Sequence, residues 1–287
     1  MPYTIFNTSL SKASNLRFGV SAIEPEPDGL PLDNGGLIQS LIHCYDVLSK
    51  RKLSYSIRLI DLLVAVPTIL VIWRFYGLVK AIRYMIGLSL ALTAQRVFIS
   101  AMIHLIGTER SSLADALTLS RGANGAVLAG LVTSGIRDRK GIAGWIGWLM
   151  PLLGVTDWLD GPLARRVGPT RIGGVLDIEA DSWLTLWSAV GSVAWGKLPG
   201  WCLLPPIIHY LEPVVAFRQS NLLWGGGPWW YRIAGAGQMG LLIVALAPFD
   251  WQKRKPFLSA ASVPISIGQS AAIFVRLAIT LKQNSGR

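Results

Sequence analysis

Long apolar runs recur from residue 59 to the end of the chain, and they constrain the fold more than any other feature. Six of them follow residue 112, and each approaches the roughly 20 residues that a helix needs to cross a bilayer. They cover residues 113–135, 142–159, 176–195, 201–217, 233–248 and 257–281. Because the runs are continuous rather than alternating, they favour helices over the strands of a membrane barrel.

The composition supports a membrane protein. Of the 287 residues, 52% are hydrophobic and only 15% are charged, whereas soluble domains carry about 25% charged residues. Several of the twelve tryptophans stand at the ends of apolar runs, as interface anchors do. This composition excludes a disordered chain and an ordinary soluble enzyme, and the two cysteines exclude a disulfide framework.

The net charge of +11 comes from lysines and arginines that are scattered between the apolar runs. This distribution fits attraction to anionic lipid head groups or to a phosphorylated substrate better than binding of nucleic acid. We therefore expect membrane lipid, and no nucleic acid, among the partners.

The first 112 residues divide into a polar extension, residues 1–56, and two accessory apolar runs within residues 57–112. The second accessory run carries Gln95 and Arg96, and charge is costly in hydrocarbon. The two runs therefore form either a membrane hairpin or a pair that lies in the interface. The predicted fold is an all-α polytopic membrane protein. It has a six-transmembrane-helix core within residues 113–287 and one or two additional N-terminal membrane or interfacial helices.

Four carboxylates stand at the ends of two neighbouring core runs. Asp157 and Asp160 are three residues apart, and Asp177 and Asp181 are four apart, so each pair shares one face of a helix. Such a cluster repels itself unless protons or cations neutralise it. Carboxylate oxygens suit Mg²⁺ or Mn²⁺, and four carboxylates are enough to hold two ions.

The residues between the two carboxylate pairs suit a diphosphate. Arg165 and Arg166 beside bound divalent ions would attract phosphate oxygens. Gly161 and Ala164 are small enough for a flat ligand to approach the backbone. The alternative is structural, with the aspartates capping helices or pairing with these arginines at the surface.

The spacing of these residues resembles the signature of the CDP-alcohol phosphatidyltransferases. That signature reads Asp-x2-Asp-Gly-x2-Ala-Arg and, after a spacer, Gly-x3-Asp-x3-Asp. All eight defined positions are present: Asp157, Asp160, Gly161, Ala164, Arg165, Gly173, Asp177 and Asp181. The spacer has seven residues where the family more often has eight. The resemblance covers about residues 113–281, and Thr118-Leu-Ser-Arg121 resembles the polar entry to the family's first helix.

The resemblance implies a metal-dependent enzyme that transfers a phosphatidyl group from a CDP-linked lipid to a small polar alcohol and releases CMP. Asp157, Asp160 and Asp177 would then be ligands of two Mg²⁺ or Mn²⁺ ions. Asp181 would lie near the second ion and act as the base. The CDP pocket would be lined by Gly161, Ala164, Arg165 and Gly173. The resemblance also implies a homodimer.

The acceptor and the orientation depend on other basic residues. Arg218 and Arg232 flank the loop between the fourth and fifth core runs. They are candidates for binding the phosphate of an acceptor such as glycerol 3-phosphate, or they extend to lipid head groups. The arginines after Asp160 favour a cytoplasmic site.

Two other functions remain open at this point. A secondary transporter with an intramembrane acidic cation site would explain the aspartates. A non-catalytic scaffold on the same fold would also retain the helices. Glu179 lies between two motif aspartates but faces away from them by helical phase, so we expect it to pack or to pair with a neighbouring arginine.

Overall fold

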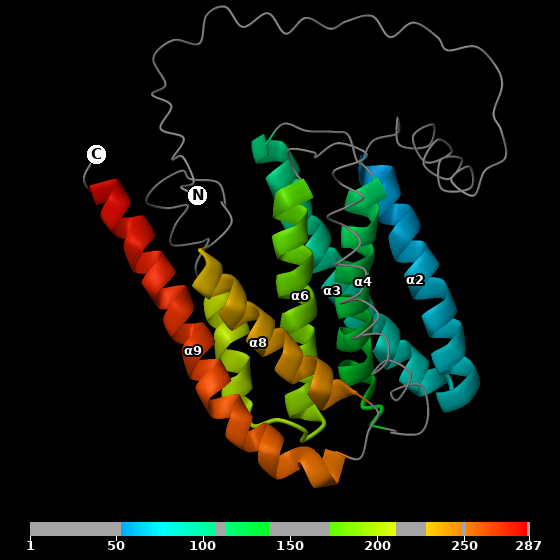
Figure 1. The fold of residues 1–287 in the computed structure, drawn as a ribbon. Coiled ribbons are helices and arrows are strands. Elements are labelled where there is room, and N and C mark those ends of the chain that lie inside the picture. Colours follow the sequence, from blue (N-terminus) through cyan, green and yellow to red (C-terminus); the bar gives the residue numbers. More distant parts are fainter. Residues whose placement is uncertain (1–52, 107–112, 138–172, 211–227, 248–250, 286–287) are drawn as a thin grey trace, which may run out of the picture. The chain divides into compact units, whose positions relative to one another are not determined.

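The computed structural model describes residues 53–106, 113–137, 173–210, 228–247 and 251–285. Within these ranges the chain is helical and contains no strand, which confirms the all-α prediction for this part (Figure 1). The elements are α2 (Leu53–Tyr76), α3 (Leu78–Ile106), α4 (Leu113–Ser134), α6 (Gly173–Ala194), the 3-10 helix η1 (Gly200–Leu203), α8 (Trp229–Leu246) and α9 (Trp251–Ser285). Residues 204–210 continue as helix after η1.

Four of these helices coincide with predicted core runs. α4, α6, α8 and α9 overlap the runs at 113–135, 176–195, 233–248 and 257–281. The predicted run at 142–159 lies outside the described residues, as does the polar extension up to residue 52. The six-span core therefore stays a prediction.

Among the described helices, three are long and apolar enough to cross a membrane: Ile57–Tyr76, Leu78–Ser100 and Gln252–Ile279. Their large apolar side chains are widely exposed, including Leu63 at 65% and Phe75 at 71%. Exposed apolar surface on this scale indicates contact with lipid rather than water. The protein is therefore a membrane protein.

The accessory region forms two helices that pack against each other and against α4. Gly77 alone separates α2 from α3, and its φ of +82° lies in the left-handed region that favours glycine. Two charged residues of this region are paired, because Arg96 on α3 forms an ion pair with the buried Asp61 on α2. Pairing of this kind lowers the cost of charge within an apolar helix pair.

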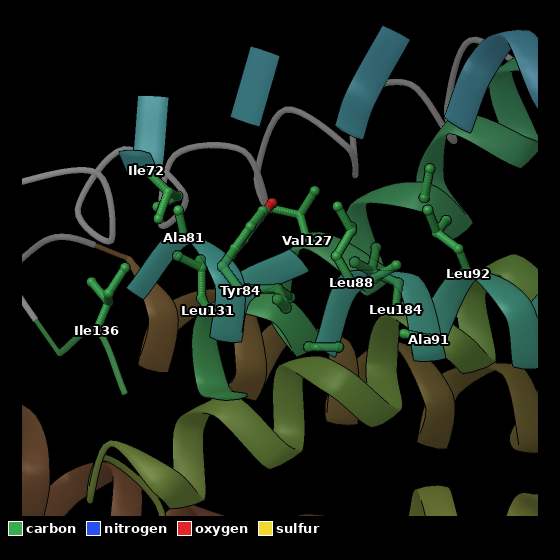
Figure 2. Close-up of a cluster of buried hydrophobic side chains, with 14 of the residues drawn as sticks. Ile72, Ala81, Tyr84, Leu88, Ala91, Leu92, Val127, Leu131, Ile136 and Leu184 are labelled. Atoms are coloured by element: carbon green, nitrogen blue, oxygen red, sulfur yellow. The ribbon is translucent and has the colours of Figure 1, made fainter. Parts of the chain in front are cut away.

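The main buried cluster lies where α3, α4 and α6 meet. Figure 2 shows Tyr84 and Leu88 of α3 packed with Leu131 of α4 and Leu184 of α6. Each of these four side chains is at most 3% exposed. The cluster holds α4 between α3 and α6, and both neighbours contact it along much of its length.

Glycines on α4 allow this close packing. A Cβ at Gly130 would lie 2.9 Å from the carbonyl oxygen of Tyr84, and one at Gly125 would lie 3.3 Å from Leu184 Cα. Further along, a Cβ at Gly191 of α6 would lie 3.6 Å from Val132 Cγ2. Because Gly125 meets Leu184 and Val132 meets Gly191, α4 and α6 run parallel.

A second buried cluster joins the end of α6 to η1, α8 and α9. It includes Ala189, Cys202, Leu242 and Leu258, all at most 2% exposed. In this cluster α8 and η1 pack against α6, the helix that carries the second half of the motif, and α9 packs against α8 and η1.

Candidate active site

Arg121 on α4 forms ion pairs with both motif aspartates that the structure describes. Its Nη2 contacts Asp177 Oδ1, and its Nη1 lies 3.1 Å from Asp181 Oδ1. The arginine side chain is 1% exposed, whereas those of Asp177 and Asp181 are 47% and 40% exposed. One buried guanidinium therefore bridges two partly exposed carboxylates.

The local sequence explains this geometry. Asp177 and Asp181 are four residues apart in α6, so they stand one above the other on one face. Arg121 precedes Gly125 by four residues and shares its face of α4. Because Gly125 lets the α6 backbone approach, Arg121 can reach both aspartates. Thr118 Oγ1, one turn earlier, accepts a hydrogen bond from Arg121 Nη2 at 3.4 Å.

The pair of carboxylates has the donor chemistry expected for a divalent ion. Two carboxylates on adjacent turns repel each other, and in this structure the Arg121 guanidinium supplies the positive charge between them. Carboxylate oxygens are the ligands that Mg²⁺ and Mn²⁺ prefer. Asp177 and Asp181 therefore fit half of the predicted donor set. Within the described ranges, no three His, Cys, Asp or Glu side chains form a group that could hold a metal.

The structure places only part of the predicted site. Gly173 is the first residue of α6, and Arg232 is exposed in the first turn of α8. The other predicted residues lie outside the described part of the chain: Asp157, Asp160, Gly161, Ala164, Arg165 and Arg218.

A chain of hydrogen bonds starts next to Asp181 and reaches α8. His209 Nε2 lies 2.8 Å from Ser182 Oγ on α6, and His209 Nδ1 lies 3.0 Å from Tyr231 Oη on α8. Ser182 Oγ donates to the carbonyl oxygen of Ile178 at 2.6 Å. On α9, the Arg276 guanidinium lies 4.6 Å from the centroid of the Tyr231 ring, within the range of a cation–π interaction.

The described contacts of this chain are compatible with a neutral His209. In that arrangement the Tyr231 hydroxyl donates to His209 Nδ1, and the N–H at Nε2 donates to Ser182 Oγ, whose own proton is given to Ile178. His209 thus connects Ser182 on α6 to Tyr231 on α8. The network links Tyr231, which precedes Arg232 in the first turn of α8, to Ser182, which follows Asp181 in the third turn of α6.

Glu179 is 4% exposed, whereas its motif neighbours lie at the edge of the protein. This agrees with the prediction that it faces away from them. Of the two arrangements that we expected for it, packing is the one that the structure has: the side chain is buried, and it accepts a hydrogen bond from Tyr210 Oη at 3.3 Å. The Tyr210 ring also packs edge-on against Trp183, with centroids 6.2 Å apart.

Sequence reasoning missed the role of Arg121 and of the histidine network. A signal for Arg121 was present, because an arginine inside an apolar run requires a counter-charge. The four aspartates of the motif were the nearest acidic cluster in the sequence. No comparable signal pointed from Ser182 or Tyr231 to His209, since hydroxyl side chains are common in apolar helices.

Comparison with known families agrees with the motif. A sequence model described as CDP-alcohol phosphatidyltransferase matches residues 111–281, which include α4, α6, η1, α8 and most of α9. No curated protein and no solved structure matches the chain.

Proposed function

This chain belongs to the CDP-alcohol phosphatidyltransferase family, and from that premise we propose that it is a metal-dependent phosphatidyltransferase. The donor is CDP-diacylglycerol or a similar CDP-lipid, and the acceptor is the hydroxyl of a small polar alcohol. The acceptor oxygen forms a bond to the lipid-linked phosphorus while the bond from that phosphorus to CMP breaks. The observation that carries the proposal is the complete motif within the matched segment, with Asp177 and Asp181 converging at the protein edge.

Each motif residue has a proposed role in this reaction. Asp157, Asp160 and Asp177 are the proposed ligands of two Mg²⁺ or Mn²⁺ ions, which when bound offset negative charge on the diphosphate. Arg165 adds charge-assisted hydrogen bonds to phosphate oxygens. Gly161, Ala164 and Gly173 leave room for the CDP moiety. Asp181 would help to hold the second ion and would accept the proton of the acceptor hydroxyl.

The same evidence supports a location at the membrane surface. The CDP head group requires water and the acyl chains require lipid, and half-exposed carboxylates on a membrane protein meet both needs. We place the site on the cytoplasmic side of a multi-pass protein because of the arginines after Asp160. We also propose a homodimer, by analogy with the family.

Arg232 and Arg218 make a phosphorylated acceptor such as glycerol 3-phosphate the preferred choice. Through His209, hydrogen bonds link Ser182, which follows Asp181, to Tyr231 in the first turn of α8, and Arg232 is the next residue of that turn and is exposed. A phosphate on the acceptor would balance additional cations near a metal–diphosphate site, and each charge-assisted contact contributes about 1.5–3 kcal/mol. Arg232→Ala should therefore raise the acceptor KM at least about tenfold, which corresponds to about 1.4 kcal/mol. An unchanged acceptor KM would make Arg232 a lipid-facing residue.

The decisive experiment follows CMP release by the purified protein in detergent. With CDP-diacylglycerol, glycerol 3-phosphate and Mg²⁺, the wild type should release CMP and form a new phospholipid. Asp181→Asn is the matched control, because it removes the proposed base and keeps the side-chain volume. If the folded wild type releases no CMP with any small alcohol, the enzyme proposal fails and a cation transporter or a scaffold becomes the better reading.

A further inference from the structure

Arg121 is buried, whereas Asp177 and Asp181, the two described aspartates that it contacts, are partly exposed. Its side chain is 1% exposed, and its two terminal nitrogens contact two different carboxylates. A guanidinium is planar and always charged, and its nitrogens are held in a fixed fork. The two contacts therefore tie the side-chain orientation of Asp177 to that of Asp181.

We propose that Arg121 is a positioning residue that orients Asp177 and Asp181 for binding of the divalent ions. This inference rests on the proposed function, since it assigns Arg121 a role toward the ions of that site. The residue acts through the two aspartates and touches neither substrate nor product. Its task is to keep two like-charged carboxylates converged on one spot before the ions arrive.

The structure supports this role because the Arg121 guanidinium and the two aspartates lie on different helices, which are fixed relative to each other at Gly125. Arg121 lies on α4 and the aspartates on α6, 56 residues later for the first of them. Arg121 Nη2 also donates to Thr118 Oγ1 at 3.4 Å, and the backbones of α4 and α6 approach closely at Gly125, one turn further. A guanidinium fixed in this way cannot follow the aspartates if they turn outward, so it restricts their rotamers. Hydrogen-bonded groups behind metal ligands commonly change metal affinity by 10–100-fold when they are removed.

The opposite effect is the main competing interpretation. A cation between two carboxylates also repels a divalent ion, so removing it would tighten metal binding if charge alone mattered. The two interpretations predict changes of opposite sign. Arg121→Gln removes both the charge and the fork. Arg121→Lys keeps the charge but offers a single nitrogen, so it breaks the link between the two carboxylates.

The test is a titration of the purified full-length protein with MnCl2, in which electron paramagnetic resonance measures free Mn²⁺. We expect both Arg121 variants to bind Mn²⁺ at least about tenfold more weakly than the wild type. The matched control is Arg96→Gln, because Arg96 also forms an ion pair between two helices, with Asp61, and lies outside the motif. That variant should keep the wild-type Mn²⁺ affinity even if its thermal unfolding temperature falls.

Each outcome decides something. If folded Arg121→Lys binds Mn²⁺ as tightly as the wild type or more tightly, the positioning role is wrong; this variant is decisive even if Arg121→Gln does not fold. Equal weakening in Arg96→Gln would also overturn the inference, because the effect would then be general destabilisation. A wild type that binds no Mn²⁺ would refute the metal site itself and the inference with it. A wild type that binds Mn²⁺ and releases CMP, with unaffected Arg121 variants, would refute the inference alone.

Discussion

Replacing Gly130 with alanine should separate α3 from α4 and destabilise the protein. The new Cβ would lie 2.7 Å and 2.8 Å from two ring carbons of Tyr84 and 2.9 Å from its carbonyl oxygen. Ordinary carbon contacts begin near 3.4 Å. The ring cannot move aside because Tyr84 is fully buried, and the carbonyl belongs to the α3 backbone. The two helices must therefore move apart by roughly half an ångström, which forfeits about a quarter of the dispersion energy at each contact.

The loss of stability caused by Gly130→Ala can be measured against a second glycine-to-alanine variant. Overpacking of a buried contact costs about 1–3 kcal/mol, but alanine also stabilises a helix over glycine by about 1 kcal/mol. Gly240→Ala on α8 is the control, because a Cβ there would meet nothing within 4 Å. Both variants gain the same helix propensity, so their difference of about 1–3 kcal/mol reports packing alone. That difference corresponds to roughly 2–12 °C in the midpoint of thermal unfolding.

The assay is thermal unfolding of both purified variants in one detergent at one scan rate, since unfolding of membrane proteins is often irreversible. Gly130→Ala should unfold at a lower temperature than Gly240→Ala. If Gly130→Ala unfolds at the same or a higher temperature, α3 and α4 do not approach as closely at Tyr84 as the structure has them.

Three further outcomes are expected. EDTA should abolish CMP release and Mg²⁺ or Mn²⁺ should restore it; full activity after exhaustive chelation would refute the metal site. Asp181→Asn should retain some CDP-lipid binding but fail in transfer. Asparagine at each of the other three motif aspartates should abolish CDP-lipid binding. Equal losses of CDP-lipid binding in all four variants would show that Asp181 is a metal ligand and not the base. Tyr231→Phe should lower stability by about 0.5–1.5 kcal/mol, because it removes the hydroxyl that hydrogen-bonds the partly buried His209 Nδ1; an unchanged unfolding temperature would show that this bond contributes nothing. Removal of residues 1–50 should leave activity in membranes largely intact, and a folded but inactive truncation would place part of the site in the extension.

The sequence by itself determined the helical membrane character and half of the site geometry. Continuous apolar runs predict helices because only a helix satisfies its own backbone groups in lipid, and α4, α6, α8 and α9 lie where the runs do. The four-residue spacing of Asp177 and Asp181 placed them on one face of α6, because helical periodicity is a local property. The motif spacing predicted the family, which the match over residues 111–281 confirmed.

Only the tertiary structure decided which helix faces meet. From the sequence, the two accessory runs could form either a membrane hairpin or a pair that lies in the interface. In the structure, α2 and α3 pack against each other and both pack against α4. Arg121 meets Asp177 because glycine lets two parallel helices approach, and His209 meets Ser182 and Tyr231 across separations of 27 and 22 residues. Such contacts depend on the packing of many side chains at once, since each helix offers several faces and periodicity does not say which partner each face will bury.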